Sequence, residues 1–218
     1  MEIMRQTRGN NTRILLLCGV LAPAILLLTI IVVGQISPNY NPVSDTISQM
    51  GVSSNPYAVA LNSSYAIYGV LMCCAAYGFY LKLRHSTLAK NLAILIGIHA
   101  IGNVFLAAFP DSADYPGKTF TEDILHNSFS ALVSIALLAC ILIFRKITRQ
   151  EKSLQVVAML GLVIILVSLP LPFINMIDSL KPFSGLLQRL IVSGSFSWIA
   201  LASVFLMRSS PRVEAVPT

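Results

Sequence analysis

Residues 14–36 read ILLLCGVLAPAILLLTIIVVGQI, an uncharged run of 23 residues that decides the class of fold. As a helix rising 1.5 Å per residue, this run spans the hydrocarbon core of a bilayer, which is about 30 Å thick. Three arginines precede it, as in a secretory signal peptide, but it exceeds the roughly 7 to 15 apolar residues of a signal core and ends without a small-x-small cleavage pattern. We therefore expect it to remain as a first membrane span.

The rest of the chain repeats this pattern. Of its 218 residues, 56% are hydrophobic and 11% are charged, whereas an average soluble domain has about a quarter charged residues. Helix is expected for each long apolar run, because lipid offers no partner to exposed backbone groups and the runs are too long for barrel strands. The predicted fold is all-α: a polytopic membrane protein with a single six-transmembrane-helix bundle over residues 1–208 and a disordered cytoplasmic tail at 209–218. The six predicted spans are 14–36, 57–81, 92–109, 125–144, 154–174 and 186–207.

Lysine and arginine predict the orientation, since positive charge is retained on the cytoplasmic side. With six spans, twelve of the 15 basic residues fall on the face that holds both termini, and Lys118, Lys181 and Arg189 fall on the other. We expect the N and C termini in the cytoplasm and the chain in the cytoplasmic membrane. The twelve are Arg5, Arg8, Arg13, Lys82, Arg84, Lys90, Arg145, Lys146, Arg149, Lys152, Arg208 and Arg212.

Two other features of the composition fit a membrane bundle. The net charge of +6 does not indicate nucleic acid, because the basic residues form small groups between apolar runs, without a basic stripe interleaved with aromatic residues. The four cysteines all lie inside apolar runs, where they are expected to fill the core as small residues.

Polar side chains inside the predicted spans are the strongest indication of a site, because such groups are unfavourable in lipid. Three spans carry them one turn apart, which places each set on one helical face. We expect these faces to turn inward around a polar cavity that opens outward under the loop at 37–56. The alternative is that the serines only let helices pack closely. The three sets are His99 and Asn103; His126, Ser130 and Ser134; and Arg189, Ser193 and Ser197.

Arg189 lies about one turn inside the outer boundary of its span, so it requires a partner. Its guanidinium group suits bidentate pairing with a carboxylate or a phosphate. Three explanations stay open: an ion pair with Asp45, Asp111 or Asp123, a contact with a bound ligand, or snorkelling to the membrane surface.

His126 has two carboxylates within one helical turn, Asp123 three residues before it and Glu122 four residues before it. Such spacing suits an acid–base pair or a metal site. The alternative is a hydrogen bond at the outer end of the helix, and a packing role is favoured for the deeper His99. Signatures of nucleotide-binding loops, serine-nucleophile elbows and zinc-protease helices are absent from the sequence, and we predict no cofactor and no bound metal.

The outer loop SPNYNPVSDTISQMGVSSNP, residues 37–56, is expected to contain a helix of one to two turns, capped by Ser44 or Asp45 and ended by Gly51. Its residues Asn41 to Ser48 and Gly51 resemble the NP-x-SDTIS-x-x-G signature of the prokaryotic membrane family called domain of unknown function 998. The resemblance continues at Phe109, Pro110 and Asp111, at His126, and from Gly185 through Gln188 to Arg189. It implies a six-helix bacterial or archaeal membrane protein whose polar motif residues gather at the outer face, and it implies no established activity.

These features predict a membrane protein that binds a lipid head group or a small solute in an outward-facing pocket. Membrane lipid is thus the expected partner; nucleic acid is not, and protein partners are not predicted. The alternative is an intramembrane lipid hydrolase or transferase that uses His126 with Asp45, Asp111 or Asp123, with or without a metal. A transporter is disfavoured, because no inverted repeat is evident. The candidate pocket residues are Asp45, Ser48, His99, Asn103, Asp111, Asp123, His126 and Arg189.

Overall fold

The computed structural model describes the backbone of residues 2–109, 120–168 and 177–209, and the side chains of 9–109, 124–167 and 177–209. These residues form six α-helices, which confirms the all-α prediction. Short 3-10 helices precede α2 and α6: η1 (Ile47–Gly51) and η3 (Lys181–Phe183). The α-helices are α1 (Glu2–Ile36), α2 (Ala58–Leu83), α3 (Ala89–Ala108), α4 (Phe120–Ile147), α5 (Lys152–Ser168) and α6 (Ser184–Arg208).

Within the described residues, α1, α2, α3, α4 and α6 are long and apolar enough to cross a membrane. The α5 helix covers 17 residues, fewer than the roughly 20 that a span requires. The fifth predicted span, at 154–174, therefore stays a prediction, since residues 169–176 lie outside the described residues. The same holds for the tail predicted at 209–218, of which the structure describes only Ser209.

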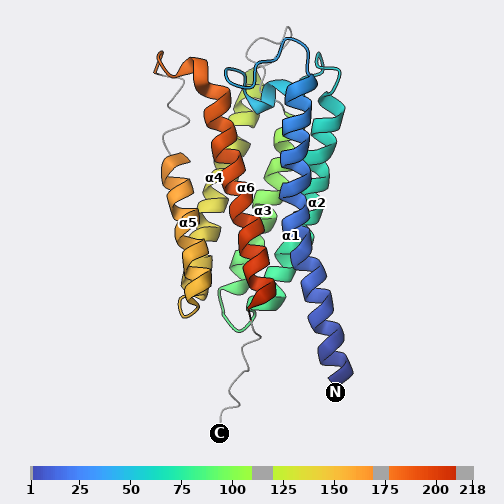
Figure 1. Cartoon of the computed structure of the whole chain (residues 1–218), viewed down its shortest axis with the longest axis vertical. Helices are drawn as coiled ribbons and strands as arrows, with labels where there is room; N and C mark the ends of the chain where they lie inside the picture. Colours follow the sequence, from blue (N-terminus) through green and yellow to red (C-terminus); the bar gives the residue numbers. More distant parts are fainter. Residues whose placement is uncertain (1, 110–119, 169–176, 210–218) are drawn as a thin grey trace.

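The helices run antiparallel to their neighbours along the chain (Figure 1). The α1 helix packs against α2 and α6, α3 packs between α2 and α4, and α5 packs against both α4 and α6. One end of the bundle, here called the basic end, holds the start of α1, the links 84–88 and 148–151, and the end of α6. The opposite end, here called the lid end, holds η1, η3 and the lid loop, residues 37–57.

The outward faces of the helices are apolar, as lipid requires. Large side chains more than 60% exposed occur on several helices, among them Leu28, Val70, Ile135, Val167 and Leu190. In water, apolar surface of this extent would favour association or aggregation. The side of the membrane that each end faces is not determined by the structure, so the cytoplasmic placement of the termini stays a prediction.

Inside the bundle, aromatic side chains and small residues set the helix contacts. Trp198 is buried, meets Phe144 edge to face at a centroid distance of 5.7 Å, and donates a 2.9 Å hydrogen bond from Nε1 to the Val157 carbonyl oxygen of α5. At Gly78 of α2, an added Cβ would lie 3.0 Å from the backbone nitrogen of Leu16 in α1. Close approach at small residues is the usual way in which membrane helices pack.

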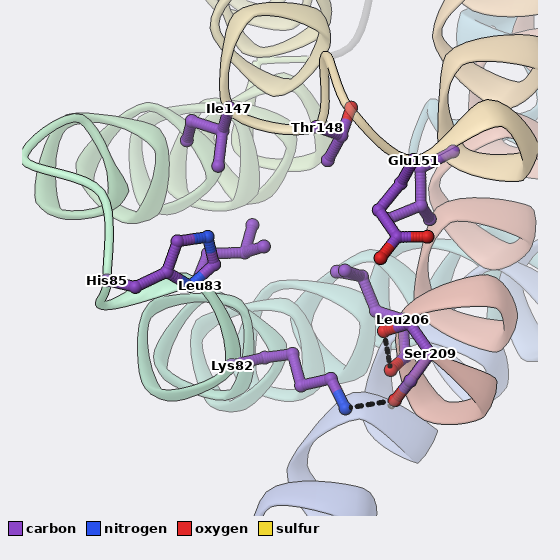
Figure 2. A pocket seen from close by; sticks show the side chains of 9 residues that line it. Lys82, Leu83, His85, Ile147, Thr148, Glu151, Leu206 and Ser209 are labelled. Atoms are coloured by element: carbon purple, nitrogen blue, oxygen red, sulfur yellow. Dashed lines mark hydrogen bonds between the residues drawn. The ribbon is translucent and has the colours of Figure 1, made fainter. Parts of the chain in front are cut away.

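A small polar hollow lies at the basic end (Figure 2). Lys82 Nζ donates a 2.7 Å hydrogen bond to the carbonyl oxygen of Ser209, just after α6, and His85, Thr148 and Glu151 contribute to the wall. Its volume is about 20 Å³, which suffices for about one water molecule. The hollow is therefore too small for a ligand larger than water.

Candidate functional site: a cavity beneath the lid loop

The lid loop is folded around Arg189 of α6. Nη1 of Arg189 donates hydrogen bonds to the carbonyl oxygens of Pro42 at 2.7 Å, Asp45 at 2.9 Å and Gly185 at 3.1 Å. Nη2 donates to the Tyr40 hydroxyl. In the described part of the chain, Arg189 is thus held by backbone oxygens and a phenol rather than by a carboxylate, and it is not among the residues that line the cavity beneath the lid loop.

Tyr40 connects the guanidinium group to the start of η1. Its ring lies 5.3 Å from Arg189 Cζ, and its hydroxyl oxygen lies 3.0 Å from the carbonyl oxygen of Asp45 and 2.9 Å from that of Thr46, so that the hydroxyl can donate to them. Burial raises the pKa of the Tyr40 phenol, and Arg189 opposes this shift only in part. Tyr40 therefore keeps its proton and acts as a donor to the loop while accepting from Arg189.

Further hydrogen bonds fix the lid loop to the first turns of α6. Ser184 Oγ donates to the Ser44 carbonyl oxygen at 2.6 Å, and the Leu186 backbone N–H donates to the Val43 carbonyl oxygen at 2.9 Å. The Ile47 N–H donates to Gln188 Oε1 at 2.6 Å. Sequence reasoning missed these partners, although Gln188 stands in a segment that resembles the family. The signature loop and the start of α6 form one hydrogen-bonded unit.

Asp45 belongs to the internal structure of the lid loop. Its carboxylate accepts a 2.7 Å hydrogen bond from the Asn41 N–H and a 2.8 Å hydrogen bond from Ser44 Oγ. The prediction that Ser44 or Asp45 caps the short helix is therefore wrong: η1 begins after Thr46, whose N–H donates to Gln49 Oε1 at 2.7 Å. The helix does end at Gly51, as predicted.

A cavity of about 480 Å³ lies beneath η1, among α2, α3, α4 and α6, with Ile165 of α5 in its wall. Along α4 it reaches from His126 to Leu138, about 18 Å at 1.5 Å per residue. Its described wall contains no lysine, arginine, aspartate or glutamate. The polar members include Thr46, Ser48, Asn62, His99, Asn103, His126, Asn127, Ser130, Ser134, Gln188 and Ser195.

Ser48 and His126 meet at the lid end of this cavity. Ser48 Oγ lies 3.3 Å from His126 Nε2, and His126 Nδ1 lies 2.7 Å from the Phe109 carbonyl oxygen. A carbonyl oxygen only accepts, so Nδ1 carries the proton and Nε2 offers its lone pair to the Ser48 hydroxyl. The Ser48 hydroxyl, the His126 imidazole and the Phe109 carbonyl oxygen therefore form one hydrogen-bonded chain. The sequence offered both residues as candidates but did not predict that they pair.

His99 lies deeper in the cavity wall, where its neighbours satisfy both ring nitrogens. Nδ1 lies 3.2 Å from the Val133 carbonyl oxygen, and Nε2 lies 2.9 Å from the Tyr68 hydroxyl. Asn103 Nδ2 donates to the His99 carbonyl oxygen at 2.8 Å. Such a network suits a neutral imidazole that holds α2, α3 and α4 together. Tyr68, which sequence reasoning missed, is fully buried.

The predicted polar faces agree only in part with the cavity. His99, Asn103, His126, Ser130 and Ser134 all line it. The face predicted on α6 is wrong: Ser197 is exposed, and the cavity is lined instead by Gln188, Ser195 and their apolar neighbours. A shift of one residue turns a helical side chain by 100°, which is enough to move it from the wall to the outside.

The carboxylates proposed for His126 are not placed beside it by the described structure. Asp111 and the side chains of Glu122 and Asp123 lie outside the described residues, and Asp45 is engaged within the lid loop. Among the described residues, no group of three histidine, cysteine, aspartate or glutamate side chains is arranged to hold a metal ion.

The long apolar helices and their lipid-facing surface define a multi-pass membrane protein. The sequence model of the family described as "Protein of unknown function (DUF998)" matches residues 20–204. The chain belongs to this family, as the lid-loop motif indicated. No curated protein and no solved structure matches the chain.

Proposed function

We propose that this protein binds a membrane lipid or a similar amphiphile in the cavity beneath η1. The polar group would lie at the lid end, near Ser48 and His126, and the hydrocarbon part would follow α4 and α6 toward Leu138 and Phe196. A volume of about 480 Å³ falls within the range of small-molecule sites, about 300–1,000 Å³.

The observation that carries this proposal is that the cavity extends sideways toward the exposed side of α4. Ser134 and Ile135 line the cavity, yet both are exposed, and Ile135 is 65% exposed. The cavity wall therefore extends to the outer surface of α4, which would face lipid in a membrane. An amphiphile entering from the bilayer would leave lipid only in part, whereas a polar solute would have to cross an apolar surface.

The lack of charged side chains in the described cavity wall favours an uncharged polar group on the ligand. Because the described wall has hydroxyl, amide and imidazole groups but no charged side chain, a buried free ion would lack a compensating charge. An uncharged hydrogen-bonding group, such as a hydroxyl, an ester or an amide, fits better. If the basic end faces the cytoplasm, as lysine and arginine favour, this polar group lies in the outer leaflet.

Filling the cavity tests the proposal. Ser195 of α6 is buried and lines the cavity, so we expect Ser195→Phe to reduce the lipid that copurifies with the protein at least tenfold, measured by native mass spectrometry from mild detergent. Leu132→Phe is the matched control, since Leu132 is 43% exposed on α4 and does not line the cavity. Equal lipid in wild type and Ser195→Phe, at unchanged unfolding midpoint, would refute the proposal.

A further inference from the structure

Ser48 and His126 have the geometry of a nucleophile and its general base, and both face the cavity. The separation of 3.3 Å between Ser48 Oγ and His126 Nε2 is slightly beyond the ideal range of about 2.6–3.2 Å, and unliganded sites are often this loose. The 2.7 Å contact of Nδ1 with the Phe109 carbonyl oxygen fixes the tautomer that accepts the serine proton. In hydrolases with a Ser-His-Asp triad, a carboxylate accepts from the histidine Nδ1–H and orients the ring. Here the Phe109 carbonyl oxygen does so.

A second observation at the same place concerns Thr46. Its Oγ1 is buried and faces the Gln49 backbone N–H in the capping box of η1, but within the described residues its own proton has no acceptor, although Thr46 lines the cavity two residues before Ser48. A buried hydroxyl whose proton has no acceptor calls for an explanation. A ligand oxygen accepting from Thr46 would provide one, and a donor beside a nucleophile is what a developing oxyanion needs.

From these observations we infer that the protein cleaves or transfers the acyl group of a carboxylic ester bound in the cavity, with Ser48 as nucleophile. This inference rests on the proposed function, because the substrate is the ester-bearing class of the amphiphiles proposed above. Phosphoryl transfer fits less well, since it depends on cationic groups around the phosphate, the described wall has none, and Arg189 is engaged by the lid loop.

The chemistry uses only these groups, the ester and water. Ser48 Oγ attacks the ester carbonyl carbon while its proton passes to His126 Nε2, and the carbonyl oxygen becomes an oxyanion that accepts from Thr46 Oγ1. The C–O bond to the alcohol breaks, and His126 protonates the departing alkoxide. Water, or an acceptor alcohol, then attacks the acyl-serine ester, giving its proton to His126, and Ser48 recovers that proton as the acid or new ester leaves.

The test is covalent labelling of the full chain in detergent by a fluorophosphonate, followed by intact-mass and peptide mass spectrometry. We expect one adduct, on Ser48. His126→Gln should slow labelling about a hundredfold or more, since general-base catalysis contributes typically 10²–10⁴, and Thr46→Val should slow hydrolysis of a p-nitrophenyl ester of a medium-chain fatty acid by a similar factor. Ser128→Ala is the control, because Ser128 is exposed on α4 and does not line the cavity.

The wild-type result is decisive even if a variant fails to fold. Absence of a Ser48 adduct on wild type, or an equal labelling rate in a folded His126→Gln variant, would overturn the inference. Copurified lipid is measured on the same preparations, so the two proposals can fail separately. Bound lipid without a Ser48 adduct refutes only the acyl chemistry, whereas loss of both refutes the binding proposal as well.

Discussion

Arg189→Ala is expected to destabilise the folded protein by about 3 kcal/mol, because it removes the donor group around which the lid loop is folded. The carbonyl oxygens of Pro42 and Asp45 and the Tyr40 hydroxyl would lose their guanidinium partner. Hydrogen bonds to charged groups contribute roughly 1.5–3 kcal/mol each, and we take less than their sum because Arg189 is only half-buried. Unfolding in detergent can be followed by the fluorescence of Trp198, the single tryptophan of the chain.

Two further variants distinguish the effect of the planar guanidinium group from that of its positive charge. Arg189→Lys keeps the positive charge but replaces the planar guanidinium group by a single ammonium group. We therefore expect a loss of folding stability between those of wild type and Arg189→Ala. Lys181→Ala is the control: its ion pair with Asp178, at 2.6 Å, joins two exposed side chains, and such pairs contribute about 0–1 kcal/mol. If Arg189→Ala unfolded at the wild-type midpoint, Arg189 would not organise the lid loop.

Gly185→Ala is expected to have a comparable effect through a steric clash. A Cβ at Gly185 would overlap the carbonyl oxygen of Asp45 and lie 2.8 Å from that of Pro42. Both are backbone atoms that Arg189 also binds, so neither can move without breaking the lid-loop contacts. Overpacking of this kind costs typically 1–3 kcal/mol, and displacement of the lid loop should bring the loss to about 3 kcal/mol.

A matched glycine serves as control for this substitution. A Cβ added at Gly97, in α3, would have no neighbouring atom within 4 Å, so Gly97→Ala should be neutral or stabilise the helix by up to about 1 kcal/mol. The measurement is the unfolding midpoint of both variants, together with the rate of protease cleavage within residues 37–57. Equal midpoints and equal cleavage would show that the lid loop does not dock on α6 as described.

Much of the fold could be predicted from the sequence, because long uncharged runs such as residues 14–36 permit only helix in lipid. The polar faces of α3 and α4 followed from the same reasoning, since His99 and Asn103, or His126 and Ser130, recur one turn apart. The face of α6 could not be predicted equally well: its serines occupy several sides of the helix, and Ser195 lines the cavity whereas Ser193 and Ser197 do not.

The contacts of the lid loop were beyond prediction for a different reason. A sequence shows that Arg189 needs acceptors and that Asp45 is a carboxylate on the same side, so an ion pair is the natural expectation. In the structure, Arg189 donates to backbone carbonyl oxygens instead. Every residue has a carbonyl oxygen, so no sequence pattern indicates which ones will be the acceptors. The Ser48–His126 pair was hidden similarly, because 78 residues separate its members and only the docking of η1 brings them together.

An experimental density map of the protein in nanodiscs made from native membrane lipids tests the central claim most directly. We expect elongated density between α4 and α6, with its polar end within hydrogen-bonding distance of Ser48 or His126 and its other end toward Leu138. A space filled by protein side chains, or one holding only separate water molecules while lipid surrounds the outside of the bundle, would contradict a lipid-binding cavity.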